Sequence, residues 1–278
     1  MRSSFALTTA DAAEVAAVAP STIKRWADQG MLPFTRTAGG HRRFERVAIE
    51  QLLRDPPGGP VAGSLAATPA GDAVALAWIR CLVAARRHEI DGRMLEARSR
   101  HASWCQVADE LAGALIEMGL QWERGHVTIA QEHVASDALM RALARIGDTL
   151  PVRLDGPRCA LACAGQDEHT LGLSLAELCL RELGWTPLWL GRRTPAAEVI
   201  RLVQSGEVQL VALSASAMIT DAAALRTLVS EVGKACAHHG VGLLLGGSGR
   251  WPERPRHGVR LSSFAEFRAH LAEARARR

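Results

Sequence analysis

The sequence lacks any uncharged apolar run of the length, about 18 residues, that a membrane-spanning helix needs. The first residues, MRSSFALTTADAAEV, hold only a brief apolar stretch before Asp11 and Glu14, which argues against a secretory signal or a transit peptide. Apolar residues make up 48% of the chain and charged residues 22%, as is ordinary for a soluble protein. We therefore expect a cytoplasmic protein with no membrane partner.

Paired cysteines and the common catalytic motifs are also missing. The six cysteines contain no Cys-x-x-Cys pair and lie in apolar segments, which is unlike a zinc site or a disulfide framework. No Ser-His-Asp arrangement, Walker loop or pair of catalytic carboxylates stands out. The cysteines are Cys81, Cys105, Cys159, Cys163, Cys179 and Cys236. We expect them to be buried apolar side chains, and we expect the protein not to be an enzyme.

Composition shifts divide the 278 residues into three predicted domains. Residues 55–71 are rich in proline, glycine and alanine and predict a linker, which leaves a small domain at 1–54. Residues 72–150 show four stretches of helical spacing and predict a bundle, and residues 151–278 alternate apolar runs with helical patterns. The predicted fold class is α and α/β multidomain: a winged helix-turn-helix head, a four-helix bundle and a Rossmann-like parallel sheet.

The first domain has the signals of two short helices and a β wing. Thr8 and Asp11 fit a capping box, and Pro20 suits the first turn of a second helix with an apolar face. Gly39 and Gly40 predict a turn between two short extended pieces. A last helix is expected from about residue 46 to residue 53.

Basic residues are concentrated in this domain, although the net charge of the whole chain is only +4. An α-helix fits the major groove of DNA, and a glycine-rich wing can approach the phosphates closely. The alternative is an ordinary solvated basic face. The side chains expected to contact double-stranded DNA are Ser21, Thr22, Lys24 and Arg25 of the second helix and Arg36, His41, Arg42 and Arg43 of the wing.

The segment TIKRWADQGMLPFTRTAGGHRRF resembles the MerR family of transcription regulators, and the resemblance covers residues 8–54. It implies that the chain binds a two-fold operator as a dimer. The polar helix cap usual in that family is Ala19 here, which weakens one cap.

A second motif follows the first strand of the predicted parallel sheet. Asp167, His169 and Gly172 have the spacing Asp-x-His-x-x-Gly, at the strand end where ligands bind in such folds. A neutral imidazole can ligate a metal, and an acidic neighbour can fix its tautomer. A histidine of this kind can equally be a surface or capping residue, so the motif alone leaves both interpretations open.

Two later strands end in small residues that belong to the same predicted edge: Ser214 and Ser216 after one, Gly246 and Gly247 after the other. In combination, the motifs resemble the cobalamin-binding domain of methionine synthase and related corrinoid proteins, over residues 155–275. The resemblance implies that His169 is the lower ligand of cobalt and Asp167 its partner. It also implies that Ser214 bonds the displaced dimethylbenzimidazole above a glycine floor. Ser216 stands where many relatives have leucine.

The predicted bundle carries Trp122, Glu132 and His133 in the pattern Trp-x9-Glu-His. A tryptophan here could simply belong to the bundle core. The pattern resembles light-sensing, adenosylcobalamin-dependent MerR-type repressors of the CarH/LitR kind, which implies that the three side chains surround the adenosyl group. Those photoreceptors commonly have a histidine after the tryptophan, and this chain has Glu123. His126 is a possible substitute ligand after illumination.

These resemblances predict a cobalamin-dependent, light-responsive repressor that binds operator DNA as a homo-oligomer, either a dimer or a tetramer. The cofactor is expected to be adenosylcobalamin or another cobalamin. Two alternatives remain open: a regulator that senses cobalamin without light, which Glu123 favours, and a corrinoid methyl carrier, which the DNA-binding head disfavours.

Overall fold

The computed structural model describes residues 6–16, 20–28, 32–37, 39–54, 73–151, 153 and 155–276. The chain forms two compact units: residues 1–69 with 119–129, and residues 70–118 with 130–278. The three predicted domain boundaries remain predictions, and the predicted linker, residues 55–71, lies outside the described residues. None of the helices in the described ranges is long and apolar enough to cross a membrane.

The first unit contains three helices and a small antiparallel sheet with the strand order β1-β3-β2. Its elements are β1 (Ala6–Leu7), α1 (Thr9–Ala16), α2 (Pro20–Asp28), β2 (Phe34–Arg36), β3 (Arg42–Glu45) and α3 (Arg46–Arg54). The capping box is present, because Thr8 N donates to Asp11 Oδ2 (2.9 Å) and Asp11 N donates to Thr8 Oγ1 (3.2 Å). The winged helix-turn-helix prediction is confirmed, while the two-residue strand β1 was not expected.

The core of this unit joins the recognition helix to the wing. Ile23 and Trp26 of α2 are buried together with Phe44 of β3. At the wing tip, Gly40 has a φ of 79°, which favours glycine, and Thr37 N donates to His41 O (2.9 Å). Predictions that concern Ala19 fall outside the described residues.

The helical bundle has the predicted number of helices, four in the range 73–149. They are α4 (Ala73–Val83), α5 (Arg87–Arg100), α6 (Trp104–Glu123) and α7 (Ile129–Thr149). The indole of Trp78, fully buried in α4, donates from Nε1 to Glu110 Oε1 of α6 (2.7 Å). A buried indole of this kind keeps its polar nitrogen satisfied while it contributes a large apolar surface to the core.

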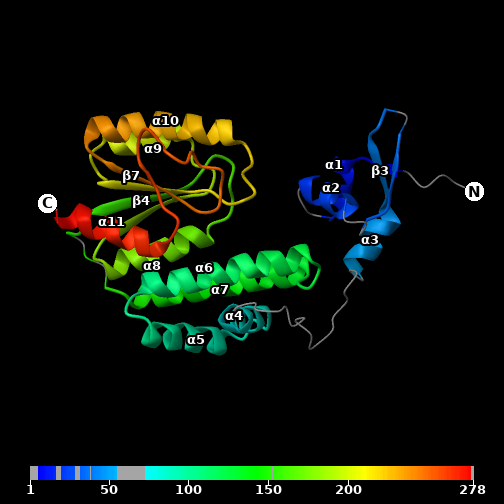
Figure 1. Ribbon diagram of the computed structural model, residues 1–278, viewed down its shortest axis with the longest axis horizontal. Coiled ribbons are helices and arrows are strands. Elements are labelled where there is room, and N and C mark those ends of the chain that lie inside the picture. Colours follow the sequence, from blue (N-terminus) through cyan, green and yellow to red (C-terminus); the bar gives the residue numbers. More distant parts are fainter. Residues whose placement is uncertain are drawn as a thin grey trace, which may run out of the picture. The chain divides into compact units, whose positions relative to one another are not determined.

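A five-stranded sheet forms the rest of the second unit, with the order β5-β4-β6-β7-β8 and parallel pairing throughout. Helices α8 and α11 cover one face and α9 and α10 the other (Figure 1). The elements are β4 (Arg158–Cys163), α8 (Leu171–Glu182), β5 (Thr186–Gly191), α9 (Ala196–Gln204), β6 (Leu210–Ser214), α10 (Ala222–His239), β7 (Gly242–Gly246), β8 (Val259–Arg260) and α11 (Phe264–Ala276). The predicted Rossmann-like parallel sheet is confirmed.

Two carboxylates join the bundle to the sheet-bearing part of the same unit. Asp109 of α6 accepts hydrogen bonds from the first backbone amides of α11, Phe264 N (2.6 Å) and Ala265 N (3.0 Å). Glu182 of α8 accepts one from Trp104 N (2.8 Å) at the start of α6. Each carboxylate thus caps a helix of the other part, where the helix dipole favours negative charge.

Candidate functional site

The predicted cofactor residues lie at the carboxyl edge of the parallel sheet. In the strand register, Cys163 of β4 lies beside Ser214 of β6, which in turn lies beside Gly246 of β7. Three motifs that are distant in the sequence therefore end side by side. This edge, next to the central strands, is where ligands bind in open α/β sheets.

The loop after β4 holds His169 against a buried carboxylate. His169 Nδ1 lies 2.8 Å from Asp167 Oδ1, and the backbone N of His169 donates to the same oxygen (3.0 Å). The Asp167 side chain is fully buried, whereas 61% of the His169 side chain is exposed. Within the described part of the chain, His169 Nε2 has no hydrogen-bond partner. The imidazole is thus fixed through one nitrogen and available through the other.

The pKa values of this pair follow from that contact. The hydrogen bond to Asp167 raises the pKa of His169, burial opposes the rise, and the charges of Asp167, Glu132 and Glu168 add to it. Burial alone raises the pKa of Asp167, but hydrogen bonds from His169 and Ser216 outweigh burial and lower it. Asp167 is therefore ionised at neutral pH and can accept a proton-bearing Nδ1.

Ser216 belongs to this group in a way that the sequence did not reveal. Its backbone N donates to Asp167 Oδ2 (2.5 Å), and its Oγ donates to Asp167 Oδ1 (3.0 Å) and lies 3.2 Å from His169 Nδ1. The contact spans 49 residues, so only the expectation that both strands end at one edge could have suggested it. Ser216 thus completes the set of donors that keeps Asp167 in its charged form.

The glycines of the site differ in what their missing side chains permit. A Cβ at Gly172 would lie 3.2 Å from Ser214 Oγ, so glycine lets α8 start close to the end of β6. Gly247 has a φ of 82° and a Cβ there would lie 2.3 Å from Ala215 O, so no other residue fits. A Cβ at Gly246 would meet nothing within 4 Å, which leaves open space over the strand end.

Two neighbours of the site were not predicted to belong to it. Cys163 Sγ donates to His169 O (3.6 Å), and burial, followed by the nearby charge of Asp167, raises the pKa of this thiol to about 11. Trp251 Nε1 donates to Gly246 O (2.7 Å) and holds the loop after β7. Neither residue lies in a recognisable motif, because each acts through backbone atoms of distant residues.

The bundle residues Glu132 and His133 lie at the start of α7. Glu132 Oε1 accepts a hydrogen bond from Ser136 Oγ (2.7 Å), and its charge acts on His169. His133 is exposed, with Nε2 3.6 Å from Glu132 Oε2. Trp122 groups with the first unit, so its place at the cofactor site stays a prediction, as does the role of His126, whose Nδ1 lies 2.8 Å from Gln121 Oε1.

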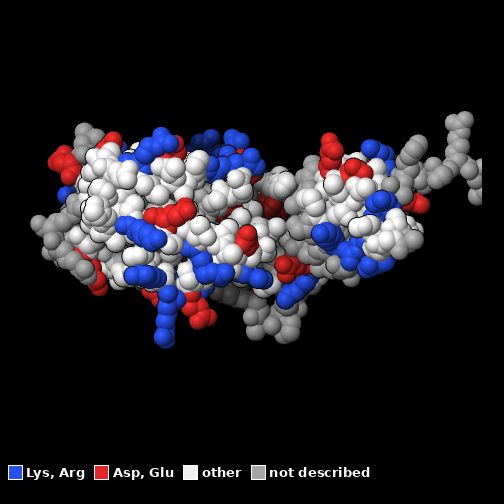
Figure 2. Space-filling model, turned by 90° about the horizontal axis from the view of Figure 1, so that it is seen from above, with Lys and Arg blue, Asp and Glu red and all other residues white. Residues whose placement is uncertain are grey.

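The predicted DNA-contacting side chains gather around α2 and the wing. Lys24 and the wing residues Arg36 and His41 are exposed, whereas Arg42 is tied down by a bond to Lys24 O (3.0 Å) and lies over the Phe34 ring. Figure 2 shows several Lys and Arg side chains close together on the visible face of this unit. The structure places Arg43 beside Arg42 in β3, and it places the backbone of Ser21, Thr22 and Arg25 in α2, while their side chains lie outside the described set.

Comparison with known proteins identifies two domains in the chain. Residues 6–55 match the family described as a helix-turn-helix domain, and residues 77–146, the bundle, match the family described as a B12 binding domain. The chain therefore combines a helix-turn-helix domain with a B12 binding domain. The predictions of a helix-turn-helix regulator with a cobalamin-binding part, and of cobalamin as cofactor, are confirmed at this level.

Two curated relatives carry the same two themes. The chain is 36% identical over 104 residues to the HTH-type transcriptional repressor CarH of Myxococcus xanthus, which is 37% of this chain and 34% of that protein. It is 24% identical over 108 residues to the dimethylamine corrinoid protein of Methanosarcina barkeri, 38% of this chain and 51% of that one. The matches thus span between a third and a half of these relatives.

A solved structure supports the fold of the second unit. The monomethylamine corrinoid protein of Methanosarcina barkeri superposes with a TM-score of 0.56 at 17% identity, over 72% of this chain and 95% of that chain. At this identity the likeness shows a shared fold and nothing finer.

The residues at the sheet edge fit a cobalamin. A corrinoid needs an imidazole nitrogen without another partner, and His169 Nε2 meets this condition. It also needs room for a nucleotide tail beside the strand ends, which the open space over Gly246 offers. The carboxylate behind His169 is the partner that metal-bound histidines usually have.

Proposed function

We propose that this protein is a cobalamin-dependent transcriptional repressor that responds to light, and that it binds operator DNA as a homo-oligomer, a dimer or a tetramer. It acts in the cytoplasm and catalyses no reaction. The observation that carries the proposal is the exposed imidazole of His169, fixed by buried Asp167, in a chain that also has a helix-turn-helix domain.

The sheet edge holds the cofactor through a few residues with separate tasks. His169 ligates cobalt through Nε2, while Asp167 and Ser216 fix the ring through Nδ1. Ser214 bonds the nucleotide tail, and the backbone at Gly246 and Gly247 forms the floor beneath it. Gly172 gives the tail access to the groove beside α8.

The bundle residues Trp122, Glu132 and His133 cover the upper face of the cofactor in this proposal. Adenosylcobalamin, when bound, supplies a cobalt–carbon bond that light can break. Loss of the adenosyl group changes the packing around these residues and shifts the oligomer equilibrium. The paired heads then no longer bind DNA together, and affinity falls because multivalency is lost.

A DNA-binding assay tests this function. Duplexes are selected from a random pool by full-length protein loaded with adenosylcobalamin in the dark, and binding is then compared without cofactor, in the dark, and after green light. We expect tight binding only in the dark with cofactor. Binding that is indifferent to both cofactor and light contradicts the proposal.

A second candidate is a sensor of cobalamin level that ignores light. Glu123 favours it, because a carboxylate stands where related photoreceptors have a second histidine for cobalt. In the same assay this candidate predicts DNA occupancy that depends on the cofactor and is equal before and after illumination. The variant Glu123→His distinguishes the two, since it should introduce a light response only if this position is the missing element.

A further inference from the structure

The second unit contains a cavity of about 400 Å³ at the edge of the sheet opposite to the candidate cofactor site. Leu210, where β6 begins, and Gly242, where β7 begins, line it, whereas the cofactor edge lies where these strands end. At ~3.3 Å per residue, the two edges are separated by the length of a five-residue strand. No residue of the cavity lining belongs to the cofactor site.

The cavity owes its walls to three glycines at which backbone and side chains approach closely. A Cβ at Gly233 of α10 would lie 2.4 Å from His257 Cβ, and one at Gly242 would lie 2.7 Å from Leu210 Cδ1. Gly258 has a φ of 81° and passes close to Leu243. These contacts fix the loop that carries His257 against α10, so the cavity is bounded by rigid elements.

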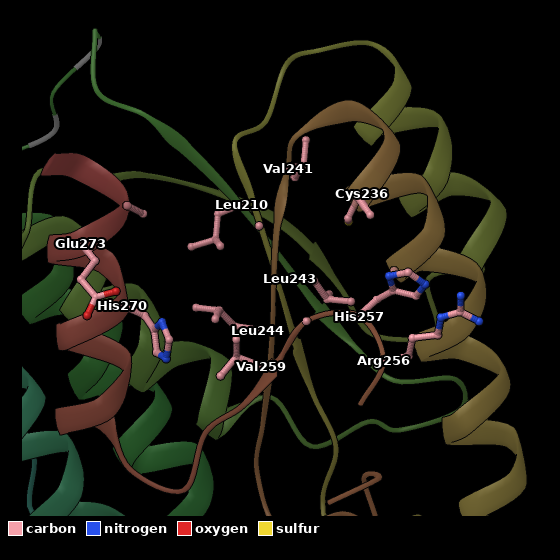
Figure 3. A pocket seen from close by; sticks show the side chains of 15 residues that line it. Leu210, Cys236, Val241, Leu243, Leu244, Arg256, His257, Val259, His270 and Glu273 are labelled. Atoms are coloured by element: carbon pink, nitrogen blue, oxygen red, sulfur yellow. The ribbon is translucent and has the colours of Figure 1, made fainter. Parts of the chain in front are cut away.

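The cavity has an apolar floor between two polar walls. Figure 3 shows Leu210, Leu244 and Val259 between the α11 side chains and the loop side chains. The polar lining residues are Arg256 and His257 of the loop and His270 and Glu273 of α11. Val259 of the edge strand β8 is 40% exposed, so part of the floor is open to an incoming apolar group.

We propose that this cavity binds a small molecule with an apolar body and a single anionic head. The body replaces water on Leu210, Leu244 and Val259, which is favourable in proportion to the apolar area covered. The head meets the guanidinium of Arg256, beside the imidazole of His257.

The opposite wall restricts the charge of the ligand. Glu273 of α11 lies across the floor from Arg256 and repels a second anionic group, so the site favours a monoanion over a dianion. Cys236 lies in the lining but is 1% exposed, and burial raises the pKa of its thiol to about 11, so it contributes apolar surface and no nucleophile.

Titration calorimetry on the full-length protein tests the site with three probes that share one apolar body: 4-phenylbutyrate, 4-phenylbutanol and 4-phenylbutylamine. We expect the carboxylate to bind most tightly. Arg256→Gln should weaken it about fivefold, as expected for one exposed charge, and leave the alcohol unchanged. Arg254→Gln, an exposed arginine of the same loop outside the lining, is the control and should change neither.

A second variant keeps the test independent of charge. Ala274→Leu fills part of the cavity from α11 and should weaken carboxylate and alcohol alike, with an unchanged circular dichroism spectrum. Equal affinity for all three probes, no binding, or carboxylate binding that neither variant weakens overturns the proposal. Cobalamin binding should be unaffected in every variant, so the outcome is separate from the proposed function.

Discussion

Asp167 Oδ1 lies 2.8 Å from His169 Nδ1, and the carboxylate behind this contact is fully buried while most of the imidazole is exposed. A buried charge is stable only where hydrogen bonds replace water, and here the side chains of His169 and Ser216 and two backbone amides do so. The fold therefore stabilises one orientation of the imidazole before any ligand arrives.

Asp167→Asn tests the importance of that charge. We expect cobalamin affinity to fall by about ten- to a hundredfold, because the histidine loses the acceptor that fixes its tautomer. Equilibrium dialysis measures the effect. Asp221→Asn is the matched control, since Asp221 caps α10 at Ala223 N and Ala224 N, and its loss should lower stability without changing cobalamin affinity.

Asp109→Ala tests the connection between bundle and sheet. The first amides of α11 lose their cap, and we expect the free energy of unfolding to fall by about 1–2 kcal/mol in urea titrations. Asp137→Ala removes a carboxylate whose ion pair with Arg141 is exposed, and it should cost less than about 0.5 kcal/mol. Equal losses in the two variants would contradict the capping role.

The pH dependence of stability should include a contribution from Glu110. Burial raises the pKa of this carboxyl, but hydrogen bonds from Trp78, His101 and Arg100 outweigh burial and lower it below 4.5. A lowered folded-state pKa means that the stabilisation is present above pH 4.5 and is lost as the pH falls through the folded-state value. Glu110→Gln should be less stable at neutral pH and show a flatter acid limb in thermal unfolding. An unchanged acid limb would refute this assignment.

Arg36 of the wing should contact phosphate rather than bases. Arg36→Gln is expected to weaken DNA binding uniformly across sequences and to reduce the slope of log affinity against log salt by about one. Fluorescence anisotropy at several salt concentrations measures both. Arg141→Gln, an exposed arginine of α7, should leave the slope unchanged. A loss confined to particular sequences would indicate base contact.

The sequence predicted the parts of the fold that follow from local patterns. The capping box at Thr8 and the helix from Pro20 depend on neighbours within a few residues, and both are present. The two-residue strands β1 and β8 are too short to show a periodicity, so they could not be found.

The candidate site shows the same division. The position of His169 at a strand end followed from the alternation of strands and helices. The bond between Ser216 and Asp167 spans 49 residues, and the cap of Asp109 on α11 spans 155, and neither leaves a local signal. Such contacts depend on the register of strands and the packing of helices, which only the folded chain defines.

The most direct test of the central claim is the visible absorption spectrum of the full-length protein after adenosylcobalamin is added in the dark and excess cofactor is removed on a desalting column. The wild-type protein should retain colour, with the spectrum of a corrinoid whose lower ligand is a protein histidine. His169→Ala should lose that signature, whereas His239→Ala, an exposed histidine at the end of α10, should keep it. A colourless wild-type protein, or an identical spectrum from His169→Ala, would contradict the account.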